Sequence, residues 1–192
     1  MAETHRHEGT TGGGGEIKSY LRFVAMIATA MLVMFGLTYV NTFELSHVSW
    51  SETRVYMTIV MGGAMAIIML GFMLGMYKNR KANAVIVVGG LVLITLGTFL
   101  VRSQTTVQDR SYMRAMIPHH SIAILTSERS EIEDVRVCRL AVEIIEAQRR
   151  EINEMEWLID DIGENGPAAT AAAGEERPVP EFSGTSLRTC SP

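Results

Sequence analysis

Three long apolar stretches without a charged residue constrain the fold of this chain more than any other feature. All 17 basic and 21 acidic residues lie outside them, and the stretches run from Phe23 to Phe43, from Val55 to Tyr77 and from Ala82 to Val101. Each is as long as the roughly 20 apolar residues that cross a bilayer as a helix, and a lipid-exposed segment must satisfy its own backbone hydrogen bonds. This excludes a single soluble domain, and we expect three transmembrane helices within residues 20–102.

Basic residues at the ends of these stretches predict the orientation in the membrane. The turn between the second and third stretches contains Lys78, Arg80 and Lys81, whereas the loop from 44 to 54 contains only Arg54. Because cytoplasmic loops carry an excess of Lys and Arg, we expect this turn to be cytoplasmic. The amino terminus is then cytoplasmic as well, and everything after the third stretch lies outside the cytoplasm.

The two ends of the chain differ in composition from the rest. Residues 1–19 are rich in Gly, and residues 163–192 are rich in Gly, Ala, Pro, Ser and Thr. Such segments bury too little apolar surface to offset the entropy of ordering, so we expect both tails to be disordered. Two cysteines, Cys138 and Cys190, do not make a disulfide framework, and neither receives a role. The net charge of −4 predicts no nucleic-acid partner.

Residues 104–162 form the segment with the character of a soluble domain, and we interpret it as a helical hairpin outside the membrane. The first helix is expected from about Thr106 to Thr126. Ser130 and Glu133 have the S-x-x-E spacing of a capping box, so the second helix is expected from Ser130 to Ile162, before Gly163. Apolar residues recur along this second helix at spacings of three, four and seven, which predicts one apolar face. They are Ile144, Ile145, Ile152, Met155, Leu158, Ile159 and Ile162.

Thioether and imidazole side chains are concentrated on the first of these helices. At 100° per residue, Met113, Met116 and His120 fall within about a 60° arc, and His119 lies about 60° further on. Closing the hairpin on its apolar faces would bring Met155 toward them. Pro118 removes one helical hydrogen bond and leaves the carbonyl of Arg114 without its partner.

Ligand chemistry limits the metal that such a cluster could bind. A set of Met and His ligands suits Cu(I), and Cu(II) through the imidazoles, but does not suit Mg²⁺ or Ca²⁺. The alternative is that the methionines only fill the core, while the histidines cap or hydrogen-bond at a helix bend. Spacing alone leaves both interpretations open.

The two parts of this pattern resemble one bacterial protein family, the domain of unknown function 305. The motifs that carry the resemblance are Asp109-x-x-Tyr112-Met113-x-x-Met116-Ile117-Pro118-His119-His120, Asp134-Val135-Arg136 and Ile144-Ile145-x-x-Gln148-x-x-Glu151-Ile152-x-x-Met155. The resemblance covers about residues 105–162. It implies a ferritin-like helical architecture, a secreted or membrane-anchored location and an association with copper.

Residue by residue, the resemblance also implies roles within the hairpin. The implied metal ligands are Met113, Met116, His119, His120 and Met155. Gln148 and Glu151 become helix-pairing groups or groups that support the ligands. Members often continue His-His-Gln, whereas Ser121 follows here, so no role is carried over for that Gln.

We therefore expect a membrane-anchored copper-binding or copper-buffering protein of the bacterial cytoplasmic membrane, with its hairpin periplasmic or extracellular. The alternative is a non-metal assembly protein that uses the hairpin for dimerisation or docking. A ferritin-like oxidase is disfavoured because di-iron sites use Glu-x-x-His pairs, and no Glu precedes His119 or His120 by three residues. We accordingly expect no enzymatic activity.

Two further expectations concern helix packing. Methionines recur along the second stretch and could form a Cu(I) path, although packing between helices is favoured; they are Met57, Met61, Met65, Met69, Met73 and Met76. The hairpin supplies two of the four helices of a ferritin-like bundle, so a homodimer would complete it. The pair Gly71 and Gly75 could bring two chains together within the bilayer.

Overall fold

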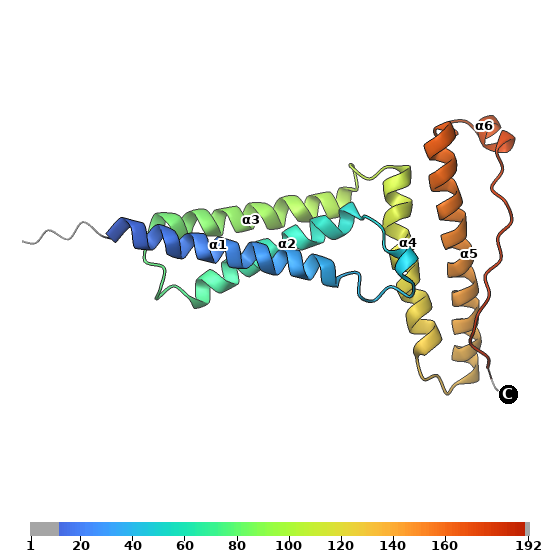
Figure 1. Ribbon diagram of the computed structural model, residues 1–192, viewed down its shortest axis with the longest axis horizontal. Coiled ribbons are helices and arrows are strands. Elements are labelled where there is room, and N and C mark those ends of the chain that lie inside the picture. Colours follow the sequence, from blue (N-terminus) through green and yellow to red (C-terminus); the bar gives the residue numbers. More distant parts are fainter. Residues whose placement is uncertain (1–11, 191–192) are drawn as a thin grey trace, which may run out of the picture. The chain divides into compact units, whose positions relative to one another are not determined.

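The computed structural model describes residues 12–190, and within them every regular element of secondary structure is a helix (Figure 1). Contacts divide these residues into two compact units, of which the first contains 12–36 and 56–103 and the second contains 37–55 and 104–190. The all-helical fold class is therefore confirmed. Residues 1–11, which were predicted to be disordered, lie outside the described part of the chain, as do residues 191 and 192.

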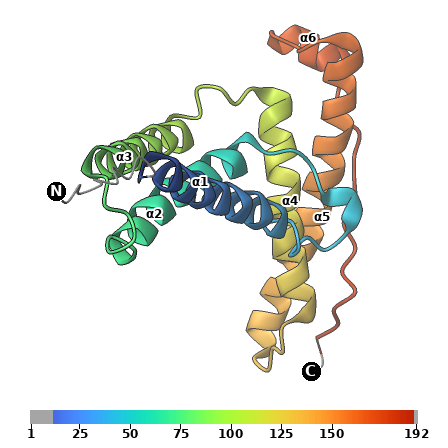
Figure 2. The same cartoon turned by 60° about the vertical axis from the view of Figure 1, so that its left-hand side comes forward.

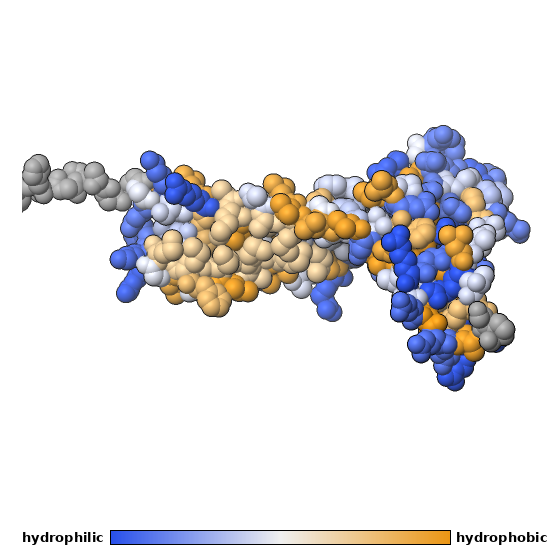
Figure 3. Space-filling view, turned by 60° about the horizontal axis from the view of Figure 1, so that its bottom comes forward, coloured by the Kyte–Doolittle hydropathy of each residue, from blue (hydrophilic) through white to orange (hydrophobic). Residues whose placement is uncertain are grey.

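Three helices of the first unit are long and apolar enough to cross a membrane, as predicted. They are α1 (Gly12–Leu37), α2 (Glu52–Phe72) and α3 (Arg80–Ser103). The space-filling view shows hydrophobic residues over most of the visible surface of these helices (Figure 3). Their length and composition indicate that the protein is associated with a membrane.

The ends of these helices differ from the predicted ones. Residues 12–19, expected to be disordered, belong to α1, which then ends at Leu37, well before Phe43. Turns follow, with hydrogen bonds from Val40 N–H to the Leu37 carbonyl and from Thr42 N–H to the Tyr39 carbonyl. The apolar run continues to Phe43 because Phe43 packs against the core of the second unit. Phe43 thus extended the predicted span although it is partly buried in the second unit.

Close packing between α2 and α3 depends on glycine. A Cβ atom on Gly63 would lie 2.7 Å from the carbonyl oxygen of Gly90, so the two backbones meet at a distance that no other residue allows. Gly71 and Gly75 do not play this part, because α2 ends at Phe72 and no atom lies within 4 Å of a Cβ built on either glycine. The expected approach of a second chain at this pair stays a prediction.

The methionines of α2 contribute to the packing of the first unit. Its buried core consists of Phe23, Ile27, Leu70 and Tyr77, and the side chains packed against this core include Met31, Met65, Met69 and Met73. Met57 and Met76, at the two ends of the series, are exposed. Three of the six recurring methionines thus fill space between helices.

The second unit is built on the predicted hairpin of α4 (Asp109–Arg129) and α5 (Val135–Asn165), which lie side by side in both views (Figures 1 and 2). The loop 37–55, with the short 3-10 helix η1 (Leu45–His47), packs against the same core. That core contains the side chains Met113, Ile117, Ile124, Ile145, Ile152 and Met155.

The turn between α4 and α5 differs from the predicted capping box. Ser130 ends α4, with its hydroxyl donating to the Thr126 carbonyl at 2.6 Å. Asp134 is the residue that caps α5, because its Oδ1 accepts from the Arg136 N–H at 2.8 Å. Asp134 Oδ2 also lies 2.6 Å from the Arg136 guanidinium. As the cap, the Asp134 carboxylate therefore has a charged partner, which the uncharged hydroxyl of Ser130 would not have.

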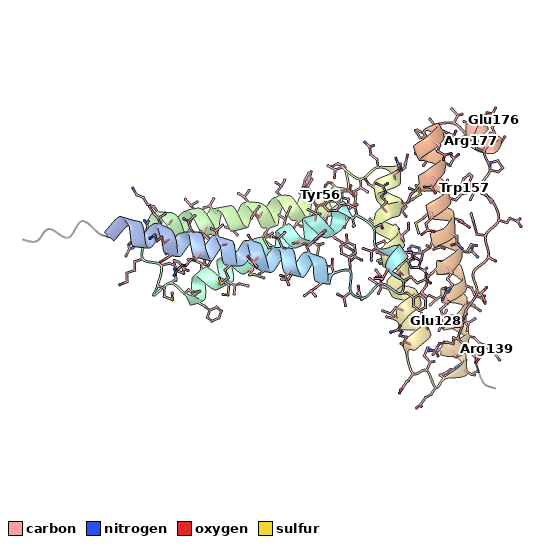
Figure 4. All side chains as sticks on the ribbon, in the orientation of Figure 1. Tyr56, Glu128, Arg139, Trp157, Glu176 and Arg177 are labelled. Atoms are coloured by element: carbon pink, nitrogen blue, oxygen red, sulfur yellow. A yellow bond between two sulfur atoms is a disulfide. The ribbon has the colours of Figure 1, made fainter. Side chains whose placement is uncertain are left out.

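Residues 163–190 are held in place rather than disordered. The segment contains α6 (Ala171–Glu176), and the Cys138–Cys190 disulfide joins its end to α5. Arg177, labelled near the end of α5 in Figure 4, contacts Asp161 at 2.7 Å. Arg188 donates to the carbonyls of Ser127 and Glu128 at the end of α4, where a cation is favoured by the helix dipole. The prediction of disorder rested on amino-acid composition, which contains no information about contacts between particular pairs of residues.

Candidate functional site

The carbonyl of Arg114 in α4 accepts a hydrogen bond from outside the helix. Helix α4 continues through Pro118, and the carbonyl of Arg114, one turn earlier, accepts a hydrogen bond of 2.5 Å from the hydroxyl of Ser49. Because proline has no N–H to offer that carbonyl, the loop 37–55 completes the helix at this point. The segment with the two histidines is thus fixed from outside α4.

The hairpin brings together the three predicted thioethers. Met113 and Met155 are both buried in the α4–α5 core, with 6% and 9% of their surface exposed, and Met116 packs against the same core. Met155 therefore belongs to the same core as Met113 and Met116, and the approach of their sulfur atoms to one another stays a prediction. Packing explains the arrangement by itself, since methionine fills irregular spaces well.

His120 faces α5 and is buried between the helices. Its Nε2 lies 2.7 Å from Glu151 Oε2, and its Nδ1 lies 2.9 Å from the Met116 carbonyl. A carbonyl oxygen only accepts, and so does an ionised carboxylate, so both contacts together need two ring N–H groups or a protonated Glu151. Neither ring nitrogen of His120 is open to a metal in this arrangement. Glu151 has the helix-pairing position that the family resemblance implies.

His119 turns away from its neighbour. It is exposed, and its ring centroid lies 6.0 Å from that of His120. His119 and Met116 line a cavity of about 570 Å³ together with Tyr112 and with Arg54 from the first turn of α2. The predicted ligands therefore fall into two groups, with His120 beside the buried core, His119 on the cavity, and Met116 in contact with both.

A further group of contacting residues in this region was not predicted as part of a site. The hydroxyl of Ser121, which is fully buried, accepts from Phe43 N–H at 2.7 Å and lies 2.9 Å from Nδ1 of the buried His47. Arg149 lies over the Phe43 ring at 5.0 Å and between the carboxylates of Glu44 (3.8 Å) and Glu128 (3.5 Å). Loop residues such as His47 have no periodic pattern, so only the position of Ser121 after the two histidines could have drawn attention here.

The donor types limit what this site can hold. Within the part of the chain that the structure describes, no three His, Cys, Asp or Glu side chains are grouped so that they could hold a metal ion. A metal bound at the hairpin would therefore have to rely on thioether sulfur in addition to imidazole. Such a donor set is soft and does not suit Mg²⁺ or Ca²⁺.

Comparisons with known proteins place the chain in a family. The family model for a domain of unknown function, DUF305, matches residues 98–183. An uncharacterized protein, L153, of Acanthamoeba polyphaga mimivirus is 30% identical over 144 residues, which cover 71% of this chain and 93% of that protein. This chain belongs to the DUF305 family. No solved structure matches it.

The DUF305 match extends further than the resemblance seen in the sequence motifs. It begins near the end of α3 and includes α4, α5 and α6, so all five candidate metal ligands lie inside it. Phe43, His47 and Ser49, which complete the second unit, lie outside the matched residues. The DUF305 region is thus supplemented here by a loop between two membrane-spanning helices.

Proposed function

We propose that this DUF305 protein binds or buffers copper at a membrane, with its second unit outside the cytoplasm. The observation that carries the proposal is the position of Met113, Met116 and Met155 in one core, beside two histidines. The proposed ligands of Cu(I) are these three thioethers with His119 and His120. No enzymatic step is part of this role.

Access to such a site would run through Met116. Its side chain packs on the core with Met113 and Met155 and also lines the cavity with His119. A copper ion that reached His119 and Met116 would be at the side chain that packs on the core of Met113 and Met155. Movement of the Met116 side chain, which is flexible and soft, would pass the ion inward.

His120 can join the ligands only when it changes partners. To bind copper through Nε2, the imidazole must lose any proton there and leave Glu151, its partner at 2.7 Å. Copper binding at His120 would therefore release a proton at low pH. Thioethers carry no such proton, so binding by the methionines persists at pH values where binding through histidine weakens.

Two features support a location outside the cytoplasm. The disulfide between Cys138 and Cys190 is of a kind that persists in oxidising compartments. Lys78 lies between α2 and α3, and Arg80 and Lys81 lie in the first turn of α3. These basic residues favour a cytoplasmic position for the α2–α3 connection and for the amino terminus. We place the protein in a bacterial cytoplasmic membrane, with the hairpin periplasmic or extracellular.

Competition for Cu(I) with a chromophoric chelator tests the proposal on the full chain in detergent. The variant Met113→Leu/Met116→Leu keeps volume and apolarity but removes two sulfur atoms, and we expect its Cu(I) affinity to fall by at least about tenfold. Met57→Leu/Met76→Leu removes two exposed thioethers from the first unit and serves as the matched control. Equal affinities in all three proteins would refute the thioether site.

Labelling with a membrane-impermeant thiol reagent tests the orientation separately. Both native cysteines are in the disulfide, so a new cysteine supplies a unique free thiol. In intact cells we expect Leu45→Cys, in the loop 37–55, to be labelled and Lys78→Cys to be protected until the cells are opened. The reverse pattern would invert the topology and remove the argument for copper outside the cytoplasm.

A second candidate role, assembly through the hairpin, is favoured by one surface of α5. Val137, Leu140 and Ile144 recur at three and four residues on one face, with exposed fractions of 49%, 54% and 36%. An apolar stripe of this kind suits a two-fold contact with a second copy. A photoreactive amino acid at Leu140 should then yield a cross-linked homodimer in membranes, and the same residue at exposed Glu156 should not.

A further inference from the structure

Another cavity of the second unit is lined by three segments that are far apart in the sequence. One of them is residues 177–190, which we call the strap and which follow α6 and run back along α5 (Figures 1 and 2). The cavity has a volume of about 250 Å³, and every residue of its wall belongs to the second unit. The wall consists of Glu44 and His47 from the loop 37–55, Arg149, Ile152 and Asn153 from α5, and Ser183 and Thr185 from the strap.

The strap is held against α5 at Gly184, between the two hydroxyl residues of the wall. A Cβ atom built on Gly184 would collide with the backbone carbonyl of Glu146, so only glycine allows the strap to approach the α5 backbone this closely. The disulfide at the end of the strap adds a covalent link to the same helix. Ser183 and Thr185 are therefore fixed at the exposed rim of the cavity.

Buried His47 contributes a hydrogen-bond donor to the wall. The fully buried hydroxyl of Ser121 accepts from the Phe43 N–H, and in the described part of the chain its one acceptor is Nδ1 of His47, at 2.9 Å. The Ser121 hydroxyl therefore donates to Nδ1, which assigns the ring proton of the neutral imidazole to Nε2. Since His47 lines the cavity, its Nε2–H can donate to an acceptor there.

Arg149 supplies the positive charge of the wall. Its guanidinium lies 3.8 Å from the Glu44 carboxylate and 3.5 Å from that of Glu128, and both distances exceed the roughly 2.7–2.9 Å of a charge-assisted hydrogen bond. Its Nε is fully buried and has no hydrogen-bond partner among the residues that the structure describes. Because a buried donor without a partner costs free energy, this side chain favours an additional acceptor oxygen.

The charges around the cavity favour a ligand that carries both signs. Two carboxylates accompany the single guanidinium, which disfavours a simple anion. Glu128 is buried and already accepts from the Leu187 N–H, whereas Glu44 is exposed at the rim. A ligand with one carboxylate and one ammonium group is complementary to this arrangement, because Arg149 and His47 offer donors while Glu44 offers an acceptor.

We propose that this cavity binds a small free α-amino acid. Its carboxylate accepts from Arg149, from His47 and from the hydroxyl of Thr185, and its ammonium group donates to Glu44. The volume of about 250 Å³ lies below the roughly 300–1,000 Å³ of sites for drug-sized ligands, which restricts the ligand to a short side chain. The inference is independent of copper, because none of the proposed copper ligands lines this cavity.

Equilibrium dialysis of the oxidised full chain in detergent and metal-free buffer tests the assignment. The probes are radiolabelled glycine, L-alanine and L-serine, and we expect the protein to retain at least one of them. Ethylamine and propionate are L-alanine without its carboxylate and without its ammonium group, so each should compete at least about tenfold less well than L-alanine. Retention of no probe would overturn the site, and equal competition by either analogue, or by inorganic phosphate, would overturn the recognition of both groups.

Substitutions in the wall make the test specific. Arg149→Lys keeps the charge but loses the planar set of donors, so the affinity for the retained amino acid should fall by about tenfold. Arg150→Lys, at the neighbouring exposed position of α5, should leave the affinity unchanged. Thr185→Val removes one hydroxyl and should lower the affinity several-fold, whereas Thr189→Val, elsewhere on the strap, should not. Unchanged affinity in both wall variants would refute the site.

A substitution at Gly184 tests the part that the strap plays. Gly184→Ala introduces the Cβ atom that collides with the Glu146 carbonyl, so the strap must move away from α5 and amino-acid affinity should fall by about tenfold. Gly174→Ala in α6 is the control, because no atom lies within 4 Å of a Cβ built there. This pair carries the test if Arg149→Lys does not fold, with helicity and formation of the disulfide as measures of folding. Wild-type affinity in folded Gly184→Ala would overturn the proposed site.

Discussion

The hydroxyl of Ser49 donates a hydrogen bond to the carbonyl of Arg114, the group that Pro118 leaves without its helical partner. Removal of the hydroxyl in Ser49→Ala should lower the free energy of unfolding by about 1 kcal/mol. In a Pro118→Ala background the N–H of residue 118 returns and can bond the same carbonyl, so the cost of Ser49→Ala should shrink. Thermal unfolding of the four proteins measures this coupling, and full additivity would contradict it. Ser46→Ala, in the same loop, is the control.

The His120–Glu151 pair predicts a second coupling, this time between α4 and α5. Glu151→Ala leaves a buried imidazole nitrogen without its partner, which should cost about 1–3 kcal/mol of stability. A double-mutant cycle with His120→Ala should give a coupling energy of about 1 kcal/mol. The matched control is Arg150 with Glu154, a pair on the surface of α5 at 3.6 Å, whose coupling should be no more than about 0.5 kcal/mol. Equal couplings in the two cycles would show that the buried pair has no special role.

The disulfide predicts a redox-dependent protection of the last segment. The Leu187 N–H donates to Glu128 Oε1 at 3.0 Å, and Arg188 contacts the end of α4 nearby. When Cys138–Cys190 is reduced, the amide of Leu187 should exchange with solvent much faster, because only local contacts then hold the segment. Hydrogen exchange with mass spectrometry measures this. Arg188→Ala should accelerate exchange even in the oxidised protein, whereas Arg139→Ala on exposed α5 should not.

Asp134 predicts a pH dependence with a defined sign. Its hydrogen bonds with the Arg136 side chain, and then with the Arg136 backbone, lower the pKa of the carboxyl from 3.8 to about 2. A depressed pKa contributes stability above the unfolded value that is lost as pH falls through the folded value. The Tm difference between the wild type and Asp134→Asn should therefore be present at pH 5 and vanish between about pH 4 and pH 2. Glu133→Gln, at the adjacent exposed position, is the matched control for the loss of a carboxylate charge.

Periodic patterns predicted those parts of the fold that depend on one face of one element. Apolar recurrence on α5 placed Met155 in the core that it shares with Met113, and three charge-free stretches located α1, α2 and α3, because helix geometry relates spacing to direction. Local composition could not distinguish burial in lipid from burial in a protein core. Phe43 was therefore assigned to a span although it contacts the hairpin.

Contacts between distant segments account for what the sequence could not predict. The partners of Ser121, which are Phe43 and His47, are separated from it by more than 70 residues, and the disulfide joins cysteines 52 residues apart. Nothing in the spacing of either partner indicates such a pair. The prediction of the helix cap before α5 was wrong for a local reason. Ser130 and Asp134 can both cap a helix, and the charged partner Arg136 favours Asp134.

The inclusion of the loop 37–55 in the same unit as residues 104–190 restricts how this architecture can vary. Two helices, α2 and α3, connect the loop 37–55 with residues 104–190. If both cross the membrane, the end of α3 returns to the face of the membrane from which α2 started. Related proteins that keep the contacts of Ser49 and His47 with α4 can therefore gain or lose membrane crossings between these segments only in pairs. An odd number of crossings there would put the loop and the hairpin on opposite faces of the membrane. The carbonyl of Arg114, which Pro118 leaves without its helical partner, would then need a donor other than Ser49.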